Sequence, residues 1–170
     1  MILVIGLGNP GPKFKHTRHN LGFMALDKLA AALGLTWQNN ARLFCHFIKT
    51  PNFILAKPQT FMNNSGQAVK ALADYYQIAP ENILIIRDDL DLPLGEIKSA
   101  QNSGSSGHKG VASIISHLNS QAFSQIKIGL SRPDAKQDIE KFVLEKFADA
   151  EKPVIKQALN QAVEILQNSL

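Results

Sequence analysis

The sequence predicts a single α/β domain over residues 1–170, with a mixed, mostly parallel sheet flanked by helices. Three observations support this prediction. Short apolar runs typical of buried strands alternate along the chain with amphipathic segments typical of helices. Two of the runs are separated only by a short turn, which adds an antiparallel hairpin. The chain has no internal repeat and no linker that would divide it into two domains.

Six apolar runs are expected to form the strands of the sheet. The first contains only apolar side chains, as in a strand that is covered on both faces. The second and third flank the turn Thr50-Pro51-Asn52 and are expected to pair as the hairpin. The strands are expected over residues 1–5, 43–49, 53–57, 82–87, 96–100 and 125–131.

Five segments carry apolar residues at the three- and four-residue spacing of an amphipathic helix. In the first of them Leu21, Ala25 and Leu29 share one face, and Gly34 supplies a stop signal. The helices are expected over residues 20–34, about 66–77, 111–118, 134–147 and 152–167.

The net charge of +4 is unevenly distributed along the chain. Residues 1–70 hold eight Lys and Arg against a single Asp, whereas residues 71–170 hold ten against thirteen acidic residues. A basic region suits a polyanionic partner such as RNA. The same bias fits an ordinary solvated surface, so charge alone leaves both interpretations open.

Composition favours a folded cytoplasmic protein. Hydrophobic residues make up 45% of the chain, which is normal for a globular protein. The single cysteine, Cys45, cannot form an internal disulfide, and its apolar neighbours favour a core position over a nucleophilic role. The apolar run at residues 1–5 is too short for a signal sequence or a membrane span, so no membrane partner is expected.

The segment Gly6-Leu7-Gly8-Asn9-Pro10-Gly11 matches the G-x-G-x-x-G pattern of dinucleotide-binding proteins. In that motif the third glycine opens a helix, and an acidic residue about twenty positions later binds the ribose. Here Pro12 follows the third glycine, helical periodicity begins only near Asn20, and Asp27 falls inside the helix. The context therefore argues against a dinucleotide site, and titration with NAD(H) would test this rival hypothesis.

Polar side chains gather at three junctions that follow strands, over residues 9–19, 60–63 and 87–91. A Gly/Ser-rich segment over residues 102–110, which contains His108 and Lys109, is expected to border them. In α/β proteins the loops at the carboxyl ends of strands build functional sites. If these segments share one edge of the sheet, they bring together His19, a carboxylate and several amides.

This set of side chains favours attack by water over a covalent intermediate. A neutral imidazole can accept a proton from water, and a nearby carboxylate can hold its tautomer. Amides can bind a carbonyl or a backbone N–H. Neither Cys45 nor Ser65 has the sequence context of a nucleophile. The alternative is structural, because His19 taken alone can be a packing residue and the asparagines ordinary turn residues.

No metal or cofactor is expected. His16 and His19 are three positions apart, but their segment contains prolines and no third ligand lies nearby in sequence. The acidic cluster Asp88, Asp89 and Asp91 could bind Mg²⁺ in principle, although a turn with solvated acids explains it as well.

Four segments resemble bacterial peptidyl-tRNA hydrolases in order and spacing over residues 1–133. They are Gly6-Leu7-Gly8-Asn9-Pro10-Gly11 through Thr17-Arg18-His19-Asn20, Thr60-Phe61-Met62-Asn63-x-Ser65-Gly66, Asp88-x-Leu90-Asp91-Leu92-Pro93 and Gly107-His108-x-Gly110. The resemblance implies a twisted mixed sheet between helices, and hydrolysis of the ester that joins a peptide to the 3′ end of tRNA. It thus implies peptidyl-tRNA as the partner of a cytoplasmic enzyme that needs no metal or cofactor, and we expect a monomer.

The resemblance also implies roles for individual residues. His19 matches the general base of the family, and Asp88 matches the carboxylate that holds this base in its accepting form. Asn9 matches the residue associated with telling N-blocked from free aminoacyl-tRNA. Substrate or tRNA contacts are implied for Phe14, Phe61, Asn63, His108 and Lys109.

Two positions depart from the family pattern. Lys109 stands where most members have Asn, and an ammonium donates hydrogen bonds but cannot accept them, so we expect it to contact a phosphate or the substrate carbonyl. Ala100 stands where a basic residue is expected, which leaves Lys98 and Lys127 as the expected phosphate contacts. A non-catalytic RNA-binding relative of the same fold is the second hypothesis, and the retained catalytic motifs argue against it.

Overall fold

The computed structural model describes residues 1–170 and contains one seven-stranded sheet in the order β2-β3-β4-β1-β5-β7-β6. The neighbours β4, β1, β5 and β7 are parallel, and only β3 and β6 run against the other strands. The predicted α/β class and mixed, mostly parallel sheet are therefore confirmed. The strands are β1 (Ile2–Gly6), β2 (Gln38–Asn40), β3 (Cys45–Lys49), β4 (Phe53–Pro58), β5 (Ile83–Asp89), β6 (Ile97–Gln101) and β7 (Ser124–Gly129).

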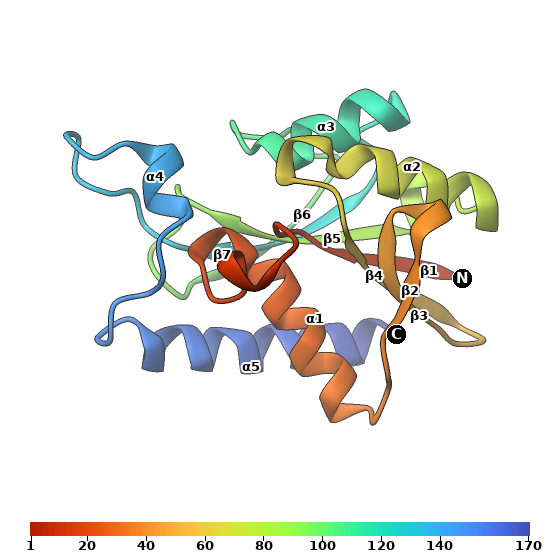
Figure 1. Cartoon of the computed structure of the whole chain (residues 1–170), viewed down its shortest axis with the longest axis horizontal. Helices are drawn as coiled ribbons and strands as arrows, with labels where there is room; N and C mark the ends of the chain where they lie inside the picture. The colour runs from red at the N-terminus through yellow and green to blue at the C-terminus, as the bar shows by residue number, and fades with distance from the viewer.

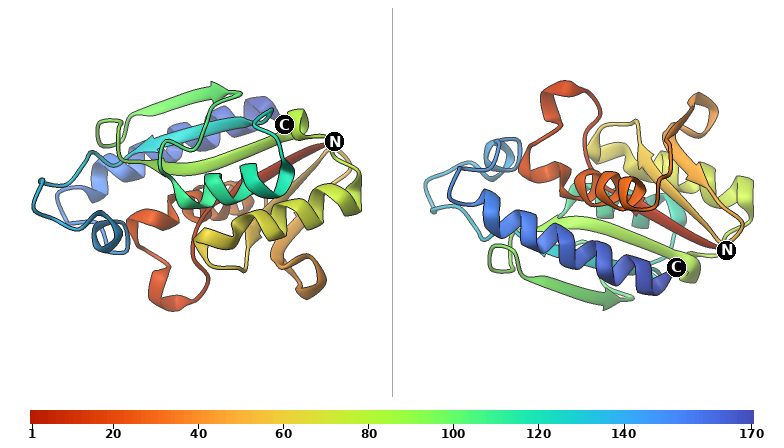
Figure 2. Two further views of the ribbon diagram at one scale, coloured as in Figure 1. Left: turned by 90° about the horizontal axis from the view of Figure 1, so that it is seen from above. Right: turned by 90° about the horizontal axis from the view of Figure 1, so that it is seen from below.

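Helices cover both faces of the sheet (Figure 1). They are α1 (Leu21–Ala32), α2 (Ser65–Tyr76), α3 (Lys109–Leu118), α4 (Ile139–Val143) and α5 (Lys152–Ser169). The pair α2 and α3 lies on one face and the pair α1 and α5 on the other, as the views from above and below in Figure 2 show. The short α4 lies beyond the carboxyl ends of the central strands, at one end of the molecule (Figure 1).

The continuous apolar run at the N-terminus forms the centre of this arrangement. Val4 of β1 belongs to the core shared with Leu26 of α1 and the buried face of α5. Its neighbour Leu3 points to the opposite face, in the core shared with Leu72 of α2. All four side chains are fully buried, and each burial stabilises the fold by about 1.5–3 kcal/mol. A strand covered on both faces needs apolar residues at every position, which is why no alternation occurs there.

A glycine in the first turn of α1 allows this helix to pack closely on the sheet and on the glycine-rich segment after β1. A Cβ on Gly22 would lie 2.2 Å from the backbone nitrogen of Leu7 and 2.4 Å from the carbonyl oxygen of Ile86. The third glycine of the segment, Gly11, has φ 102° and precedes a 3-10 turn over Pro12–Phe14, whereas α1 begins only at Leu21. This differs from a dinucleotide-binding motif, in which the third glycine opens the helix.

The helix expected over residues 134–147 is wrong in extent, because only Ile139–Val143 is helical. Asp138 caps its N-terminus by accepting a hydrogen bond from the backbone N–H of Glu140. Beyond its C-terminus, the carbonyl of Glu145 accepts from the backbone N–H of Arg18, and Lys146 forms an isolated bridge with Thr17. These long-range backbone contacts replace the next helical turn.

The region before the hairpin also differs from the expectation. The strand predicted over residues 43–49 begins at Cys45, because Ala41–Leu43 forms a 3-10 turn and Phe44 adopts a left-handed conformation with φ 54°. The short β2 was not predicted. Cys45 is fully buried, as expected, and burial raises the pKa of its thiol to about 12.

The ends of the remaining elements shift by one or two residues from the expected positions, and the largest consequence is at β5. This strand continues through Asp89, so Asp88 and Asp89 are its last residues rather than part of the following turn.

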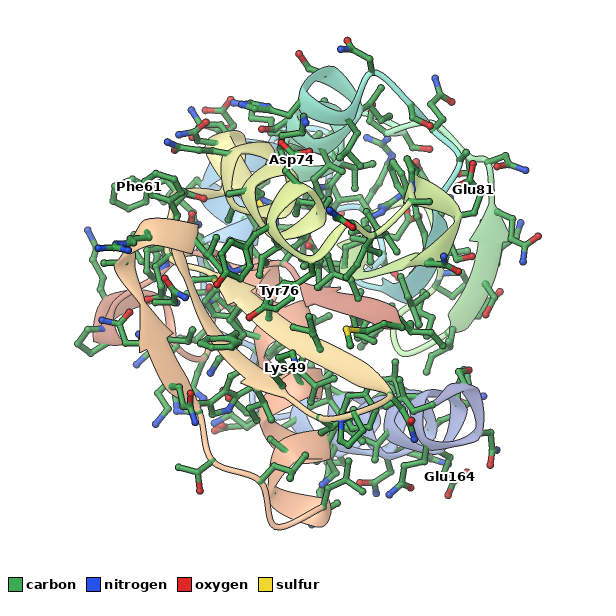
Figure 3. All side chains as sticks on the ribbon, turned by 90° about the vertical axis from the view of Figure 1, so that its right-hand side faces the viewer. Lys49, Phe61, Asp74, Tyr76, Glu81 and Glu164 are labelled. Carbon is green, nitrogen blue, oxygen red and sulfur yellow. The ribbon has the colours of Figure 1, made fainter.

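At the other end of the molecule, Tyr76 is the last residue of α2 and lies beside Lys49 of β3, whose ammonium is 6.0 Å from the centroid of the tyrosine ring (Figure 3). None of the helices has the length and apolar character required to cross a membrane.

Candidate active site

A cavity of about 350 Å³ opens at the carboxyl ends of β1 and β5. The parallel order of these strands brings the loops that follow them to the same edge, next to the start of α3 and the short α4. Seven of the residues proposed from the sequence line it: Asn9, His19, Phe61, Asn63, Asp88, His108 and Lys109. Phe14, Lys98 and Lys127 do not line the cavity.

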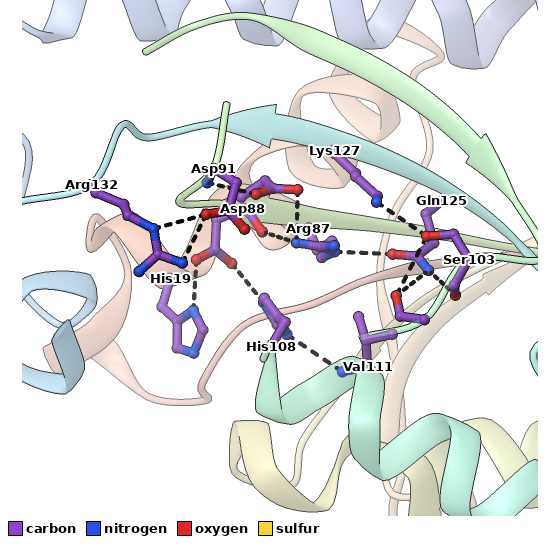
Figure 4. A network of polar contacts seen from close by, with 12 residues as sticks. His19, Arg87, Asp88, Asp91, Ser103, His108, Val111, Gln125, Lys127 and Arg132 are labelled. Carbon is purple, nitrogen blue, oxygen red and sulfur yellow. Dashed lines mark hydrogen bonds and ion pairs between the residues drawn. The ribbon is translucent and has the colours of Figure 1, made fainter. Parts of the chain in front are cut away.

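The centre of the site is the carboxylate of Asp88, which is almost completely buried at the end of β5. Its Oδ2 lies 2.9 Å from Nδ1 of His19, and its Oδ1 lies 2.9 Å from Nε2 of His108 (Figure 4). The two imidazole rings are 4.9 Å apart between centroids. A single carboxylate therefore holds two histidines from loops that are distant in the sequence.

The hydrogen bonds determine which ring nitrogen of each histidine carries the proton. His108 is the N-cap of α3, and its Nδ1 accepts a hydrogen bond from the backbone N–H of Val111 at 3.4 Å. Its proton is therefore on Nε2, which donates to Asp88. His19 donates from Nδ1 to the other carboxylate oxygen, so Nε2 of His19 keeps its lone pair and is free to accept a proton.

Burial and charge act on these groups in opposite directions. For His19, burial would lower the pKa, but the charge and hydrogen bond of Asp88 outweigh it and raise the pKa above its ordinary value. The ammonium of Lys109 opposes this rise. Burial lowers the pKa of His108, which favours its neutral form. Burial of Asp88 would raise its pKa, but the two histidines together hold it well below the ordinary value.

His19, Asp88 and His108 are also the one group of side chains close enough together to be considered as metal ligands. Their facing atoms are already joined by hydrogen bonds, and Nδ1 of His108 is occupied by the helix N-terminus. The acidic cluster is divided among different partners, since Asp89 lies 3.3 Å from Arg87 and Asp91 lies 2.8 Å from Arg132. These side chains are therefore bonded to one another or to arginines, and they do not point together at a position that a metal ion could occupy.

Asn9 is held at the cavity wall by buried hydrogen bonds. Its backbone N–H donates to Oδ1 of Asn20, and its carbonyl accepts from Nδ2 of the same residue, both at 2.9 Å. Its side-chain Oδ1 accepts from the backbone N–H of Met62 at 2.8 Å. The Nδ2 group makes no hydrogen bond within the protein, so the amide presents donors to the cavity. Asn20 is the buried residue that fixes this orientation, and sequence analysis assigned it no role there.

Two aromatic residues form a patch at the rim of the cavity, where Phe61 is exposed and Phe14 is half-buried. Phe61 is 61% exposed and projects from the edge of the molecule in Figure 3. Phe14 packs against it edge to face, with ring centroids 6.4 Å apart. Asn63, on the same segment as Phe61, is exposed at the cavity rim. Exposed aromatic rings of this kind are suited to stacking on bases of a single-stranded end.

The three lysines proposed as anion contacts have different environments. Lys109 is exposed at the first turn of α3 and forms an ion pair with Glu140 of α4, across the cavity. Lys98 and Lys127 pair in register on β6 and β7, and Arg87 pairs with Lys127 from β5, so three cations form a row across the sheet. Burial, followed by the charge of Arg87, lowers the pKa of Lys127.

Two buried arginines at the site were not singled out from the sequence. Arg87 is a buried cation directly after the apolar run of β5, and a charge in that position is the signal that could have identified it. Arg18 holds the C-terminal segment against the loop of His19, through Glu151 at 2.8 Å and by stacking 4.2 Å from the ring centroid of Phe142. The sequence offered no signal for these distant partners.

Comparisons with known proteins agree on a single family. The family model described as peptidyl-tRNA hydrolase matches residues 3–170. A peptidyl-tRNA hydrolase from Aquifex aeolicus is 43% identical, over 99% of this chain and 89% of its own length. One from Synechocystis is 40% identical with the same coverage. The crystal structure of peptidyl-tRNA hydrolase from Acinetobacter baumannii superposes with a TM-score of 0.89 at 34% identity, covering 96% of this chain and 85% of that one.

Proposed function

The chain belongs to the peptidyl-tRNA hydrolase family, and from that premise we propose that it hydrolyses the ester between peptide and tRNA with His19 as general base and Asp88 as the group that orients it. The observation that carries the proposal is the pair of tautomers at Asp88. Because Nδ1 of His19 donates to the carboxylate, Nε2 of the same ring faces the reaction with a free lone pair.

In the proposed reaction, Nε2 of His19 takes a proton from a water molecule as that water attacks the ester carbonyl. The buried carboxylate of Asp88 stabilises the imidazolium that forms. The imidazolium then returns the proton to the 3′ oxygen of the ribose as the ester bond breaks. A general base of this kind contributes about 10²–10⁴ in rate. The reaction uses water and needs no metal or cofactor.

Amide donors at the cavity are proposed to bind the substrate carbonyl. The free Nδ2 of Asn9 is suited to donate to an oxygen, and Asn63 at the rim adds a second amide. One well-placed donor to the tetrahedral oxyanion contributes about 3 kcal/mol. A free α-ammonium would lose its hydration against these donors, so a peptide or other blocked amine is preferred over free aminoacyl-tRNA.

The tRNA end is proposed to extend from the cavity over the aromatic patch at its rim. Phe14 and Phe61 are suited to stack with unpaired bases near the 3′ end. Lys98 and Lys127 are proposed to contact phosphates, because both lie in the row of cations. Lys109 is proposed to leave Glu140 and bind a phosphate or the substrate carbonyl when the substrate arrives.

The test uses diacetyl-lysyl-tRNA as an N-blocked substrate and lysyl-tRNA as its unblocked counterpart. We expect the wild-type protein to release free tRNA from the first much faster than from the second. His19→Ala should abolish turnover with tRNA affinity nearly unchanged, whereas His46→Ala on β3, outside the cavity, should retain activity. Near-normal hydrolysis by His19→Ala would contradict the proposal that His19 is the general base. Binding without release by the wild type would instead indicate a non-catalytic RNA-binding relative.

A further inference from the structure

The Gly/Ser-rich loop between β6 and α3 is attached to the sheet at both ends. At its last residue, His108 donates to the carboxylate of Asp88 at 2.9 Å. Near its beginning, the carbonyls of Ser103 and Gly104 accept from Nε2 of Gln125, at 2.8 and 3.3 Å. Gln125 is fully buried on β7, so the side chain that binds the loop to the sheet has no access to water.

Gln125 is connected in turn to the residue that carries the catalytic carboxylate. Its Oε1 accepts from Nε of Arg87 at 3.0 Å, and Nη1 of Arg87 donates to the backbone carbonyl of Asp88 at 2.9 Å. Figure 4 shows Arg87 between Asp88 and Gln125, with His108 on the side of α3. A continuous chain of hydrogen bonds therefore runs from the start of the loop through the sheet to Asp88, and closes at the end of the loop.

We propose that Arg87 and Gln125 are positioning residues that hold Asp88 and the Gly/Ser-rich loop in fixed positions relative to each other, so that the carboxylate remains directed at His19. This inference rests on the proposed roles of Asp88 and His19. It adds two buried residues that act through Asp88 and the loop.

The chemistry of Arg87 supports this role. A guanidinium presents donors in fixed directions from one plane, so Nε and Nη1 can reach two separate acceptors at once, which an ammonium at this position cannot do. Its Nη2 is buried and has no hydrogen-bond partner. An unpaired buried donor is destabilising, and removing the guanidinium from water is costly even with Asp89 3.3 Å away. The hydrogen bonds to Gln125 and Asp88, together with the ion pair with Asp89, explain why the buried guanidinium is tolerated.

The two halves of this chain of hydrogen bonds can be disrupted separately by mutation. Arg87→Lys keeps the positive charge near Asp89 but loses the bridge between Gln125 and Asp88. We expect kcat to fall by about ten- to hundredfold, as for a catalytic group that is slightly misplaced. Because Asp88 is what raises the pKa of His19, the acid limb of the kcat profile should move to lower pH. Arg42→Lys, the same change at an exposed arginine, serves as the control and should alter neither quantity.

Gln125→Glu keeps an acceptor for Arg87 and removes the donor to the loop. We expect the amides of Asn102 and His108, which donate to the carbonyls of Phe123 and Ser105 at the two ends of the loop, to exchange hydrogen faster than in the wild type, with a higher KM and an unchanged acid limb. An unshifted acid limb in folded Arg87→Lys would overturn the proposal, and so would unchanged loop exchange in Gln125→Glu. If Arg87→Lys does not fold, the exchange measurement decides alone.

The same experiments separate this inference from the proposed function. His19→Ala is measured beside them, and activity in that variant would contradict the mechanism without affecting loop exchange. An inactive His19→Ala together with unaffected Arg87→Lys and Gln125→Glu would contradict only the positioning role.

Discussion

At the scale of single residues, one buried carboxylate controls two histidines that differ in what they can do. His108 uses both ring nitrogens, one for Asp88 and one for the N-terminus of α3. His19 uses only Nδ1, and its side chain remains partly exposed to the cavity. An isolated buried carboxylate would be strongly destabilising, so the two donors also stabilise Asp88 in its ionised form. Of the two rings, only that of His19 therefore has a nitrogen available to accept a proton.

Replacing Asp88 with Asn should disturb both the rate and its pH dependence. The side-chain amide introduced by Asp88→Asn would donate to Nδ1 of His19 and place the proton on Nε2, which removes the base, so kcat should fall by about 10²–10⁴. With the carboxylate gone, burial and Lys109 lower the pKa of His19. Activity requires neutral His19, so the acid limb of the residual rate should move to lower pH. A pH–rate profile identical to that of the wild type would show that Asp88 neither orients His19 nor raises its pKa.

Replacing Lys109 with Asn tests the contact of this lysine with the substrate. Loss of an ammonium that binds an anionic group should raise KM and make KM less dependent on salt. Because Lys109 lowers the pKa of His19, its removal should also move the acid limb to higher pH. Steady-state kinetics at two salt concentrations measure these effects. An unchanged KM with unchanged salt dependence would contradict the contact.

The candidate site was predictable from the sequence where polar residues gather near the end of an apolar strand or in the loop that follows it. The loop of His19 and the acids near the end of β5 were found in this way, because the ends of parallel strands meet at one edge of the sheet, whereas the choice of Asp88 among the acids came from the family resemblance. The second bond of Asp88, to His108, could not be predicted, because it depends on how a Gly/Ser-rich loop folds back over the sheet. Arg87 and Gln125 were missed for a related reason, since each gains its role only from the neighbouring strand.

At the scale of elements, the contact between β1 and α1 sets the position of His19. The loop that carries His19 leaves β1 and enters α1, whose first turn touches the backbone of Leu7 and Ile86 at Gly22. These elements were predictable because their apolar patterns are strong. The extent of α4 and the existence of β2 were not, because backbone pairing of Arg18 with Glu145 and of Gln38 with Phe47 depends on distant segments.

Gly22→Ala should therefore destabilise the protein and disturb the site together. A Cβ at this position would overlap backbone atoms at 2.2 and 2.4 Å, which cannot move without separating α1 from the sheet. We expect a loss of about 1–3 kcal/mol or more in the free energy of unfolding, measured by urea denaturation. Gly104→Ala is the matched control, because a Cβ there meets only the end of the Gln121 side chain at 3.9 Å. Equal stability of the two variants would contradict the close packing.

At the scale of the whole molecule, the sheet order places the candidate cavity beside a row of cations, of which Lys98 is exposed. The cavity lies at one edge, and the row of cations runs across β5, β7 and β6 beside the same edge. The net charge of +4 adds a long-range attraction for tRNA. In the proposed function, affinity for the tRNA body and chemistry at the ester therefore come from neighbouring but separate groups.

Binding of tRNA should accordingly weaken as salt increases. Each phosphate neutralised by a lysine contributes about 0.7–0.9 to the slope of log K against log salt concentration. Lys98→Gln should reduce the slope by about one such contact. Lys156→Gln on α5, exposed on the helix that covers the opposite face of the sheet, should leave it unchanged. Equal slopes for both variants would remove Lys98 from the interface.

The central claim, that neutral His19 keeps its proton on Nδ1 and its lone pair on Nε2, is tested most directly by ¹⁵N NMR of the imidazole rings. Signals are assigned by comparison with His19→Gln and His108→Gln. Above the pKa of His19, we predict an unprotonated Nε2 for His19 and a protonated Nε2 for His108. A proton on Nε2 of His19 under these conditions would contradict the account.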